Sequence, residues 1–480
     1  MIDPRHVWGV SLPASALPIA MGGLTALGLL YSRNLDIWLL CLASLWITIL
    51  CIGGRKSHPV FWFFIIVSWS RVFADVMLAD VNDLDLSDWG KEAIFYSLIS
   101  LFFIACGIRF GFGAGRSVEP NYLQVRSPTL RQMFGVYLCS LPIFTLLAIA
   151  ARISQSTQQI FGSFLALKAV LVYCIAASVY QTGRGYTVLM LFLAGEVVLG
   201  FAGFFAAFKE PIIIACVAAL SSYPGDGLGR AINKRFVLAS LCAAAVIWLS
   251  LVWITVRPEY REWLNEGSGA QVVVKTLPER LAWLSDELFS EKLMHGNIDY
   301  RRASESLLSR IAYTYYYSLV LERRDAGLIP PDEARWLGTI KRIMMPRLFF
   351  PDKSAVNDSE TTERLTGISI DQNTSIGVGY IAETHLDFGF PLMLVPLFAI
   401  GFAMGRVARA FANMNAPRII CDGFICGAIV GAFAYESAID KALPGFVLSS
   451  GALAICARYV YPVFARKFGR KVQSGIQSEA

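Results

Sequence analysis

The chain has 480 residues, of which 55% are hydrophobic and only 16% carry a charge, and its mean hydropathy is +0.54. Soluble chains carry roughly a quarter charged residues, so this chain has too little polar surface to cover a water-soluble protein. The composition excludes that class and indicates a membrane protein. The net charge of +6 does not indicate nucleic-acid binding, because the basic residues are spread over short loops and tails.

The ten cysteines fall in or beside apolar runs, so neither a disulfide scaffold nor a structural metal site is expected. The first apolar run follows Arg5 and His6 and continues to Leu30, which is too long for a cleaved signal peptide. We therefore expect this run to remain in the protein as its first span.

Apolar windows recur along the chain and predict an all-α membrane protein of roughly twelve transmembrane helices. They cover residues 12–31, 37–52, 59–78, 93–108, 134–150, 160–180, 186–208, 211–222, 236–256, 390–408, 419–435 and 443–463. We expect three parts: an N-terminal transmembrane bundle over residues 1–256, an insert over 257–388, and C-terminal transmembrane helices with a tail over 389–480.

The distribution of charge predicts the orientation of these spans. With the N-terminus in the cytoplasm, the basic clusters of the connecting loops and the tail fall almost everywhere on the cytoplasmic side, in agreement with the positive-inside rule. They are Arg55 and Lys56, Arg109 to Arg131, Arg230 to Arg235, Arg406 to Arg418, and the tail from Arg466. A loop on the opposite side holds Asp80, Asp83, Asp85 and Asp88. Both termini are therefore expected inside, and the insert on the far face.

The insert is expected to be helical at first and irregular later. Residues 277–294 and 304–321 repeat apolar side chains at helical spacing, and Pro330-Pro331-Asp332-Glu333 predicts the start of a third helix over 334–345. Residues 346–373 are expected to be a long irregular segment, either a disordered connector or a binding loop, and its aromatic side chains, prolines and fixed charges favour the binding loop. The segment after this loop is expected to run directly into the tenth span.

Arg347 and Lys353 flank an aromatic stretch of this loop, Phe349-Phe350-Pro351. They could clamp a phosphate-bearing lipid, in which Arg supplies a planar fork and Lys a point charge. Anchoring to lipid head groups is the other interpretation, since Arg, Lys and aromatic residues concentrate at membrane interfaces.

Two further sets of charged residues lie close to predicted spans. Glu383, His385 and Asp387 alternate shortly before the tenth span, where partial desolvation would make a carboxylate a better general base. Attraction of an acid to a helix N-terminus is the simpler explanation for Asp387. Lys209 and Glu210 interrupt an apolar run, which indicates either a polar cavity or a mutually paired, snorkelling couple.

Other motifs have weaker implications. Asp83-Leu84-Asp85 has a spacing compatible with a divalent cation, although a solvated acidic loop explains it as well. Gly111, Gly113 and Gly115 are expected in a turn, because no strand-to-helix context suitable for phosphate binding surrounds them. The chain has no HExxH and no GxSxG motif, so it lacks the residues that metalloproteases and serine hydrolases usually need.

At Pro346-Arg347, Phe350-Pro351-Asp352-Lys353, Thr374-Ser375, Ala382-Glu383 and Asp387-Phe388-Gly389, the sequence resembles the Wzy-type polymerases. These membrane enzymes join undecaprenyl-diphosphate-linked oligosaccharide repeats of bacterial surface polysaccharides, and they resemble O-antigen ligases and GT-C glycosyltransferases in fold. The resemblance covers the last third of the insert and the adjoining span. Elsewhere only the topology agrees, with many spans and one large late loop.

The resemblance implies an inverting, metal-independent glycosyltransferase of the bacterial inner membrane, with the insert in the periplasm and no cofactor. Glu383 is then the expected catalytic base and His385 a second catalytic candidate. The expected diphosphate-binding residues are Arg347, Lys353, Arg364 and Lys209. The implied partners are the lipid-linked donor and acceptor, the bilayer, and a chain-length regulator and flippase of the same pathway.

Three alternatives stay open at this point. A flippase or transporter for the same lipid-linked sugars would favour charges buried in several spans and an internal repeat. A metal-dependent GT-C transferase would use Asp83 and Asp85. A non-catalytic subunit of an envelope assembly would need none of these residues.

Overall fold

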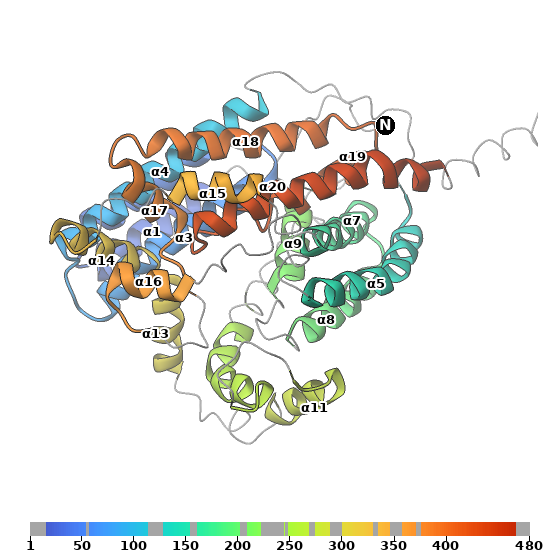
Figure 1. Cartoon of the computed structure of the whole chain (residues 1–480), viewed down its shortest axis with the longest axis horizontal. Coiled ribbons are helices and arrows are strands. Elements are labelled where there is room, and N and C mark those ends of the chain that lie inside the picture. Colours follow the sequence, from blue (N-terminus) through green and yellow to red (C-terminus); the bar gives the residue numbers. More distant parts are fainter. Residues whose placement is uncertain are drawn as a thin grey trace, which may run out of the picture.

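The computed structural model describes residues 16–53, 57–113, 128–153, 161–201, 209–221, 244, 248–267, 274–288, 300–329, 335–345, 358–370 and 376–466. Within these ranges the chain forms helices, turns and short connections, and no strand (Figure 1). The predicted all-α class is confirmed for this part of the chain.

Six helices of the described residues are long and apolar enough to cross a membrane. They are Pro59–Val81, Asp88–Phe112, Leu130–Leu147, Phe161–Thr182, Leu394–Ala412 and Ile439–Arg466, and three shorter apolar helices cover Leu17–Tyr31, Leu35–Cys51 and Tyr186–Gly200. The chain thus has the character of a helical membrane protein. The total of roughly twelve spans stays a prediction.

The N-terminal helices follow the predicted apolar windows closely. They are α1 (Ala16–Tyr31), α2 (Leu35–Cys51), α3 (Pro59–Val81), α4 (Asp88–Phe112), α5 (Leu130–Ile153), α7 (Ala166–Thr182), α8 (Tyr186–Phe201) and α9 (Lys209–Ser221). A further helical stretch covers residues 248–264. The helix starts have local causes: the Oγ atom of Ser87, for example, accepts a hydrogen bond from the Gly90 N–H of α4 at 3.0 Å.

The insert contains more helices than predicted. They are α11 (Leu277–Leu288), α13 (Tyr300–Ile311), α14 (Thr314–Asp325), α15 (Arg335–Met344), α16 (Asp358–Thr366) and α17 (Tyr380–Phe388). The expectation of an irregular stretch over 346–373 was wrong for α16. The segment before the tenth span is a separate helix, α17, which ends at Gly389 with a φ of +66°.

The single helix predicted over 304–321 is split between α13 and α14, because α3 binds the chain at the break. The N–H of Tyr313 donates to the carbonyl oxygen of Arg71 at 3.3 Å. Asp75 of α3 then accepts hydrogen bonds from the Thr314 hydroxyl and, at 3.0 Å, from the Tyr315 N–H. A carboxylate from another helix thus caps α14, and this contact could not be read from the local sequence pattern.

The C-terminal part contains α18 (Leu394–Ala412), α19 (Arg418–Ile429) and α20 (Ile439–Ile455), which continues through a π-helical turn, η3 (Cys456–Val460). The predicted eleventh span over 419–435 is helical only as far as Ile429, and turns follow to residue 437. These turns carry the chain to the start of α20.

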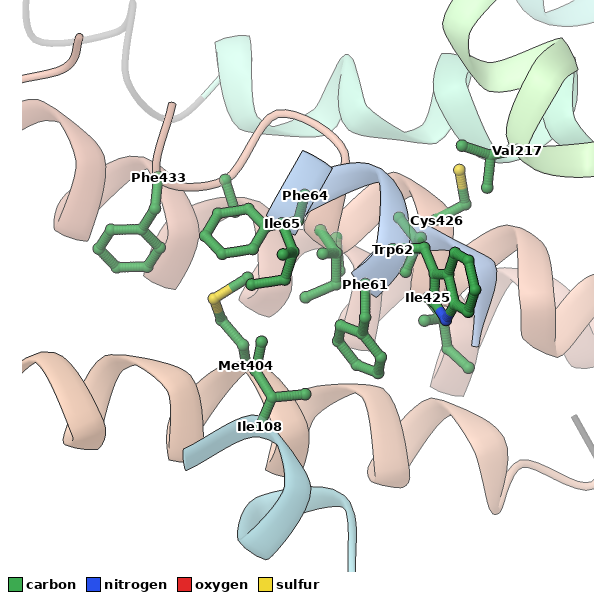
Figure 2. Packing of buried hydrophobic residues seen from close by; sticks show 14 of the residues in the cluster. Phe61, Trp62, Phe64, Ile65, Ile108, Val217, Met404, Ile425, Cys426 and Phe433 are labelled. Carbon is green, nitrogen blue, oxygen red and sulfur yellow. The ribbon is translucent and has the colours of Figure 1, made fainter. Parts of the chain in front are cut away.

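The core is formed largely by α3, α4, α7, α18 and α19. Figure 2 shows part of it, where Ile108 of α4 and Met404 of α18 meet Phe61 and Ile65 of α3. These four side chains are at most 1% exposed. Their close packing fixes the helices against which the insert lies.

Glycines allow α4 and α18 to approach at backbone distance. A Cβ atom at Gly107 or Gly111 of α4 would collide with the backbone of α18, and one at Gly401 or Gly405 would collide with that of α4. This is the small-xxx-small pattern of membrane helix pairs. The interpretation of Gly111 as a turn residue was wrong, since it lies inside α4. The facing positions increase together along both helices, so α4 and α18 run in the same direction.

Candidate functional site

A cavity of about 190 Å³ lies between α15, α16, α17 and the start of α20. Its lining consists of Arg335, Gly338, Thr339, Arg342, Thr361, Thr362, Arg364, Gly377, Glu383, Ala438, Ile439 and Asp440. The insert therefore supplies most of the walls, and the first turn of a candidate membrane span supplies the remainder. Two of the residues predicted for the site, Glu383 and Arg364, are brought together here.

The polar stripe of α15 forms one wall. Arg335, Thr339 and Arg342 are spaced four and three residues apart, which places them on one face of a helix. Thr339 is only 1% exposed, and its hydroxyl has no hydrogen-bond partner among the described residues. Sequence reasoning missed all three residues, although their helical spacing was a visible signal.

Glu383 lies on the opposite wall and binds the N-terminus of α20. Its side chain is 3% exposed, and Oε2 accepts a hydrogen bond from the Ile439 N–H at 2.6 Å. Ile439 is the first residue of α20, so the carboxylate lies at the positive end of that helix dipole. The contact satisfies one of the backbone N–H groups that have no partner within the helix at its start.

One helical turn later, Asp387 acts in the same way on another helix. Its Oδ2 accepts a hydrogen bond from the Trp336 N–H of α15 at 2.7 Å, and the Trp336 indole N–H donates to Thr384 at 3.0 Å. The attraction of Asp387 to a helix N-terminus is thus present, but the helix is α15 and not the tenth span. α17 thereby fixes the N-termini of α15 and α20 around the cavity.

The cavity is suited to an anion with several oxygens. Three guanidinium groups and two carboxylates line it, which leaves a net positive charge. The guanidinium of Arg342 lies 3.6 Å from the carboxylate of Asp440, so these two charges are paired at the cavity wall. Arginine forks and helix N-termini both bind phosphate oxygens.

The volume limits the size of the ligand. Pockets for drug-sized molecules measure about 300–1,000 Å³, so a cavity of about 190 Å³ has room for a small group such as a phosphate or diphosphate. A whole oligosaccharide would have to extend beyond the described walls.

His385 lies on the other face of α17 and does not line this cavity. Its Nδ1 atom is 2.6 Å from the Tyr317 hydroxyl, and its ring packs edge-on against Tyr96 with centroids 4.8 Å apart. Burial, with a smaller contribution from Arg324, lowers the pKa of His385 to about 4. The ring is therefore neutral at physiological pH, and the position gives no support to the predicted catalytic role.

Of the other predicted phosphate-binding residues, the structure describes Lys209, which does not line the cavity. Lys209 begins α9 and has electrostatic contact with Arg71, Glu436 and Arg310 instead. Arg347 and Lys353 lie outside the described residues, so their predicted roles stay predictions. Arg364 of α16 is the one member of this set that lines the cavity in the part of the chain the structure describes.

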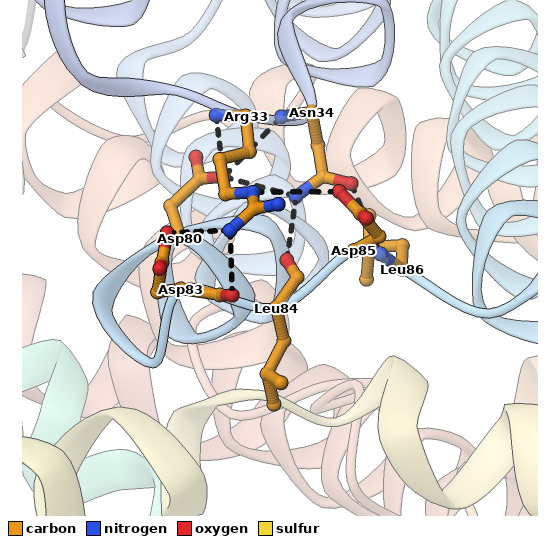
Figure 3. A network of polar contacts seen from close by, with 7 residues as sticks. All are labelled: Arg33, Asn34, Asp80, Asp83, Leu84, Asp85 and Leu86. Atoms are coloured by element: carbon orange, nitrogen blue, oxygen red, sulfur yellow. Dashed lines mark hydrogen bonds and ion pairs between the residues drawn. The ribbon is translucent and has the colours of Figure 1, made fainter.

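The acidic turn between α3 and α4 is occupied by Arg33 (Figure 3). The guanidinium of Arg33 lies 2.7 Å from the carboxylate of Asp83 and 3.6 Å from that of Asp85, and Asp80 accepts a hydrogen bond from the Arg33 N–H at 3.1 Å. No group of three metal-ligating side chains occurs among the described residues. The geometry thus favours a charge-paired loop over a cation site.

The aromatic side chains of the insert mainly pack against one another. Trp263 and Trp283 are stacked with centroids 5.7 Å apart, and Tyr260 completes this small second core beside α11. Tyr317 is 1% exposed and binds His385. These side chains therefore stabilise the insert.

Comparison with known proteins identifies no relative: no family model, no curated protein and no solved structure matches this chain. A functional assignment therefore rests on the motif residues and on the cavity described above.

Proposed function

We propose that the protein is a Wzy-type polymerase that joins undecaprenyl-diphosphate-linked oligosaccharide repeat units into a bacterial surface polysaccharide. The observation that carries the proposal is the cavity that combines Glu383 with Arg335, Arg342 and Arg364 at the junction of the insert and the candidate span beginning at Ile439. A base and a diphosphate site, adjacent to a membrane helix, are the parts that such a reaction needs.

In the proposed reaction, a hydroxyl of the acceptor glycan attacks the anomeric carbon of the donor sugar. The new glycosidic bond forms as the carbon–oxygen bond to the diphosphate breaks, with inversion at that carbon. Glu383 accepts the hydroxyl proton, and the undecaprenyl diphosphate leaves with the electron pair of the broken bond. The arginines stabilise the negative charge that develops on the leaving diphosphate.

Arg347 and Lys353 remain candidates for a further part of the diphosphate site. Residues 346–357 connect α15 to α16, and both helices line the cavity. Both ends of this segment therefore follow or precede a helix that lines the cavity. Lys209 belongs to a different polar cluster and is a weaker candidate.

We further propose an inner-membrane location with the insert in the periplasm. The Lys and Arg asymmetry of the loops supports this orientation. The parallel packing of α4 and α18 agrees with the predicted number of spans, because two spans in the same direction need an odd number of crossings between them. The predicted fifth to ninth spans meet this requirement.

A flippase for lipid-linked sugars is the second candidate, and one observation favours it. The amine of Lys168 in α7 lies 2.6 Å from the carboxylate of Glu196 in α8, whose side chain is 3% exposed. The Tyr137 hydroxyl of α5 donates to the same carboxylate. Ionisable groups buried between membrane helices often belong to transport pathways.

The test uses the full-length protein reconstituted in phospholipid vesicles that contain undecaprenyl-diphosphate-linked repeat units. A polymerase should produce a ladder of longer lipid-linked glycans and release one undecaprenyl diphosphate for each linkage formed. Movement of the sugars across the bilayer without any lengthening would support the flippase and refute the polymerase.

A further inference from the structure

α15 has two faces of opposite character, and their arrangement is unusual. Thr339, Arg335 and Arg342 point to the cavity, as described above. On the opposite face, Leu337 is 68% exposed and Ile340 is 45% exposed, and Lys341 beside them is exposed as well. The polar side chains are thus directed inward and the large apolar ones outward.

This pattern is the reverse of that on a helix at the surface of a water-soluble domain, where the apolar stripe faces the core. Exposed leucine and isoleucine side chains one helical turn apart would be unfavourable in water. They are favourable if the medium around this face of α15 is hydrocarbon.

The neighbours of α15 indicate the same medium. α15 packs alongside α20, which begins the candidate span Ile439–Arg466 (Figure 1). The Trp336 ring packs edge-on against Phe388, with centroids 6.1 Å apart, where α17 leads into α18. Leu392 and Val395 at the start of α18 are 64% and 68% exposed. α15 therefore packs against one candidate span, and the start of a second one, which follows α17, has exposed apolar side chains.

We propose that α15 is a bilayer-contacting helix, with Leu337 and Ile340 in the hydrocarbon at the membrane boundary and Lys341 among the lipid phosphates. Tryptophan and lysine at the ends of such a surface, here Trp336 and Lys341, are typical of helices anchored at a lipid interface. The occupant of this surface is the phospholipid bilayer. The contact does not depend on the proposed reaction.

One consequence does rest on the proposed function. If α15 contacts lipid, a single helix separates the arginine-lined cavity from the bilayer. A lipid-linked diphosphate could then bind Arg335 and Arg342 while its isoprenoid chain stays in the hydrocarbon.

The experiment places a photo-crosslinking amino acid at position 337 or 340 of the full-length protein, reconstituted in phosphatidylethanolamine and phosphatidylglycerol vesicles without any lipid-linked sugar. Val395 of α18 is the lipid-facing reference, and Asp325, exposed at the end of α14, is the water-facing one. After illumination, mass spectrometry counts phospholipid adducts. We expect yields at 337 and 340 that are several-fold above that at 325 and similar to that at 395.

Two outcomes would overturn the proposal. In the first, position 395 forms phospholipid adducts, but the adduct yields at positions 337 and 340 are no higher than the yield at position 325. The other is crosslinking of these positions to protein in place of lipid, which would make this face of α15 a protein contact. Because no sugar substrate is present, neither outcome bears on the polymerase assay.

Discussion

Two helix pairs of this protein, α4 with α18 and α15 with α20, differ in what lies between their helices. In the first pair, Gly107 and Gly401 place no side chain between the helices where they come closest, and the two backbones approach each other directly. In the second pair, Arg342 and Asp440 face each other at 3.6 Å and the helices do not close. A cavity of about 190 Å³ remains there.

The comparison shows where a helical membrane protein gains stability and where it keeps space for chemistry. Small residues allow close van der Waals packing, which is the main attraction between helices in lipid. Charged residues at a helix contact prevent such packing and are tolerated only if hydrogen bonds and opposite charges satisfy them. The glycine contact of α4 with α18 stabilises the fold, and the charged contact of α15 with α20 forms part of the candidate site.

The largest expected effect comes from breaking the closed pair. Gly401→Leu places a branched side chain where even a Cβ atom would collide with the Ile104 carbonyl of α4. Because neither backbone can shift without disturbing the core, the substitution should destabilise the protein by about 3 kcal/mol or more. The melting temperature in detergent, followed by size-exclusion chromatography after heating, should fall strongly.

Gly451→Leu is the matched control for this substitution. Gly451 lies in α20, and a Cβ atom added there meets nothing within 4 Å. Leucine favours the helix over glycine, so this variant should be as stable as the original protein. Equal stability of both variants would show that the α4 and α18 contact is not tight.

The next largest effect is expected at the cavity beside α15 and α20. Glu383→Gln keeps the shape and an acceptor for the Ile439 N–H but removes basicity, so polymerisation should fall by about 10²- to 10⁴-fold. Unextended lipid-linked repeats should accumulate in the vesicle assay. Near-normal extension by a well-folded Glu383→Gln protein would refute the assignment of the base.

Asp387→Asn is the matched control, since it changes a carboxylate on the same face of α17 that also binds a helix N-terminus. Its side-chain oxygen can still accept the Trp336 N–H, and Asp387 does not line the cavity. We expect a much smaller loss of activity than for Glu383→Gln. Equal losses would show that both carboxylates act only by holding helices in place.

Much of the closed pair could be predicted from the sequence, and much of the open pair could not. Hydrophobic windows located α3, α4 and α18 within a few residues, because a lipid environment requires continuous apolar helices. The GxxxG spacings of Gly107 with Gly111 and of Gly401 with Gly405 were also present in the sequence. Their meaning was missed because Gly111 was assigned to a turn.

The cavity depends on contacts between distant segments, which local patterns do not encode. Glu383 was recognised as a candidate, but its partner Ile439 lies 56 residues away. Arg342 was overlooked because its significance comes from facing Asp440 across two helices. By contrast, the distribution of polar residues on α15 was readable, and it would have predicted Arg335 and Arg342 together.

A smaller effect is expected at the arginines. Arg342→Ala should slow polymerisation by about 30-fold, since a lost charge-assisted hydrogen bond to a phosphate oxygen corresponds to about 2 kcal/mol. Arg342→Lys should still be impaired, because lysine keeps the charge and loses the two-pronged geometry. Arg280→Ala on α11, which lies away from the cavity, is the control (Figure 1). Normal rates for both Arg342 variants would remove this residue from the diphosphate site.

The smallest effect is expected where the chain has acidic residues but no cavity. Asp83→Ala combined with Asp85→Ala removes two carboxylates whose side chains are 83% and 74% exposed and which form ion pairs with Arg33. Exposed pairs of this kind contribute little to stability, so the fold should be retained. Polymerisation should stay within a few-fold of the original rate, with or without a chelator. Loss of activity in the double variant, together with rescue of chelated original protein by a divalent cation, would move the chemistry from the cavity beside α15 to the acidic turn.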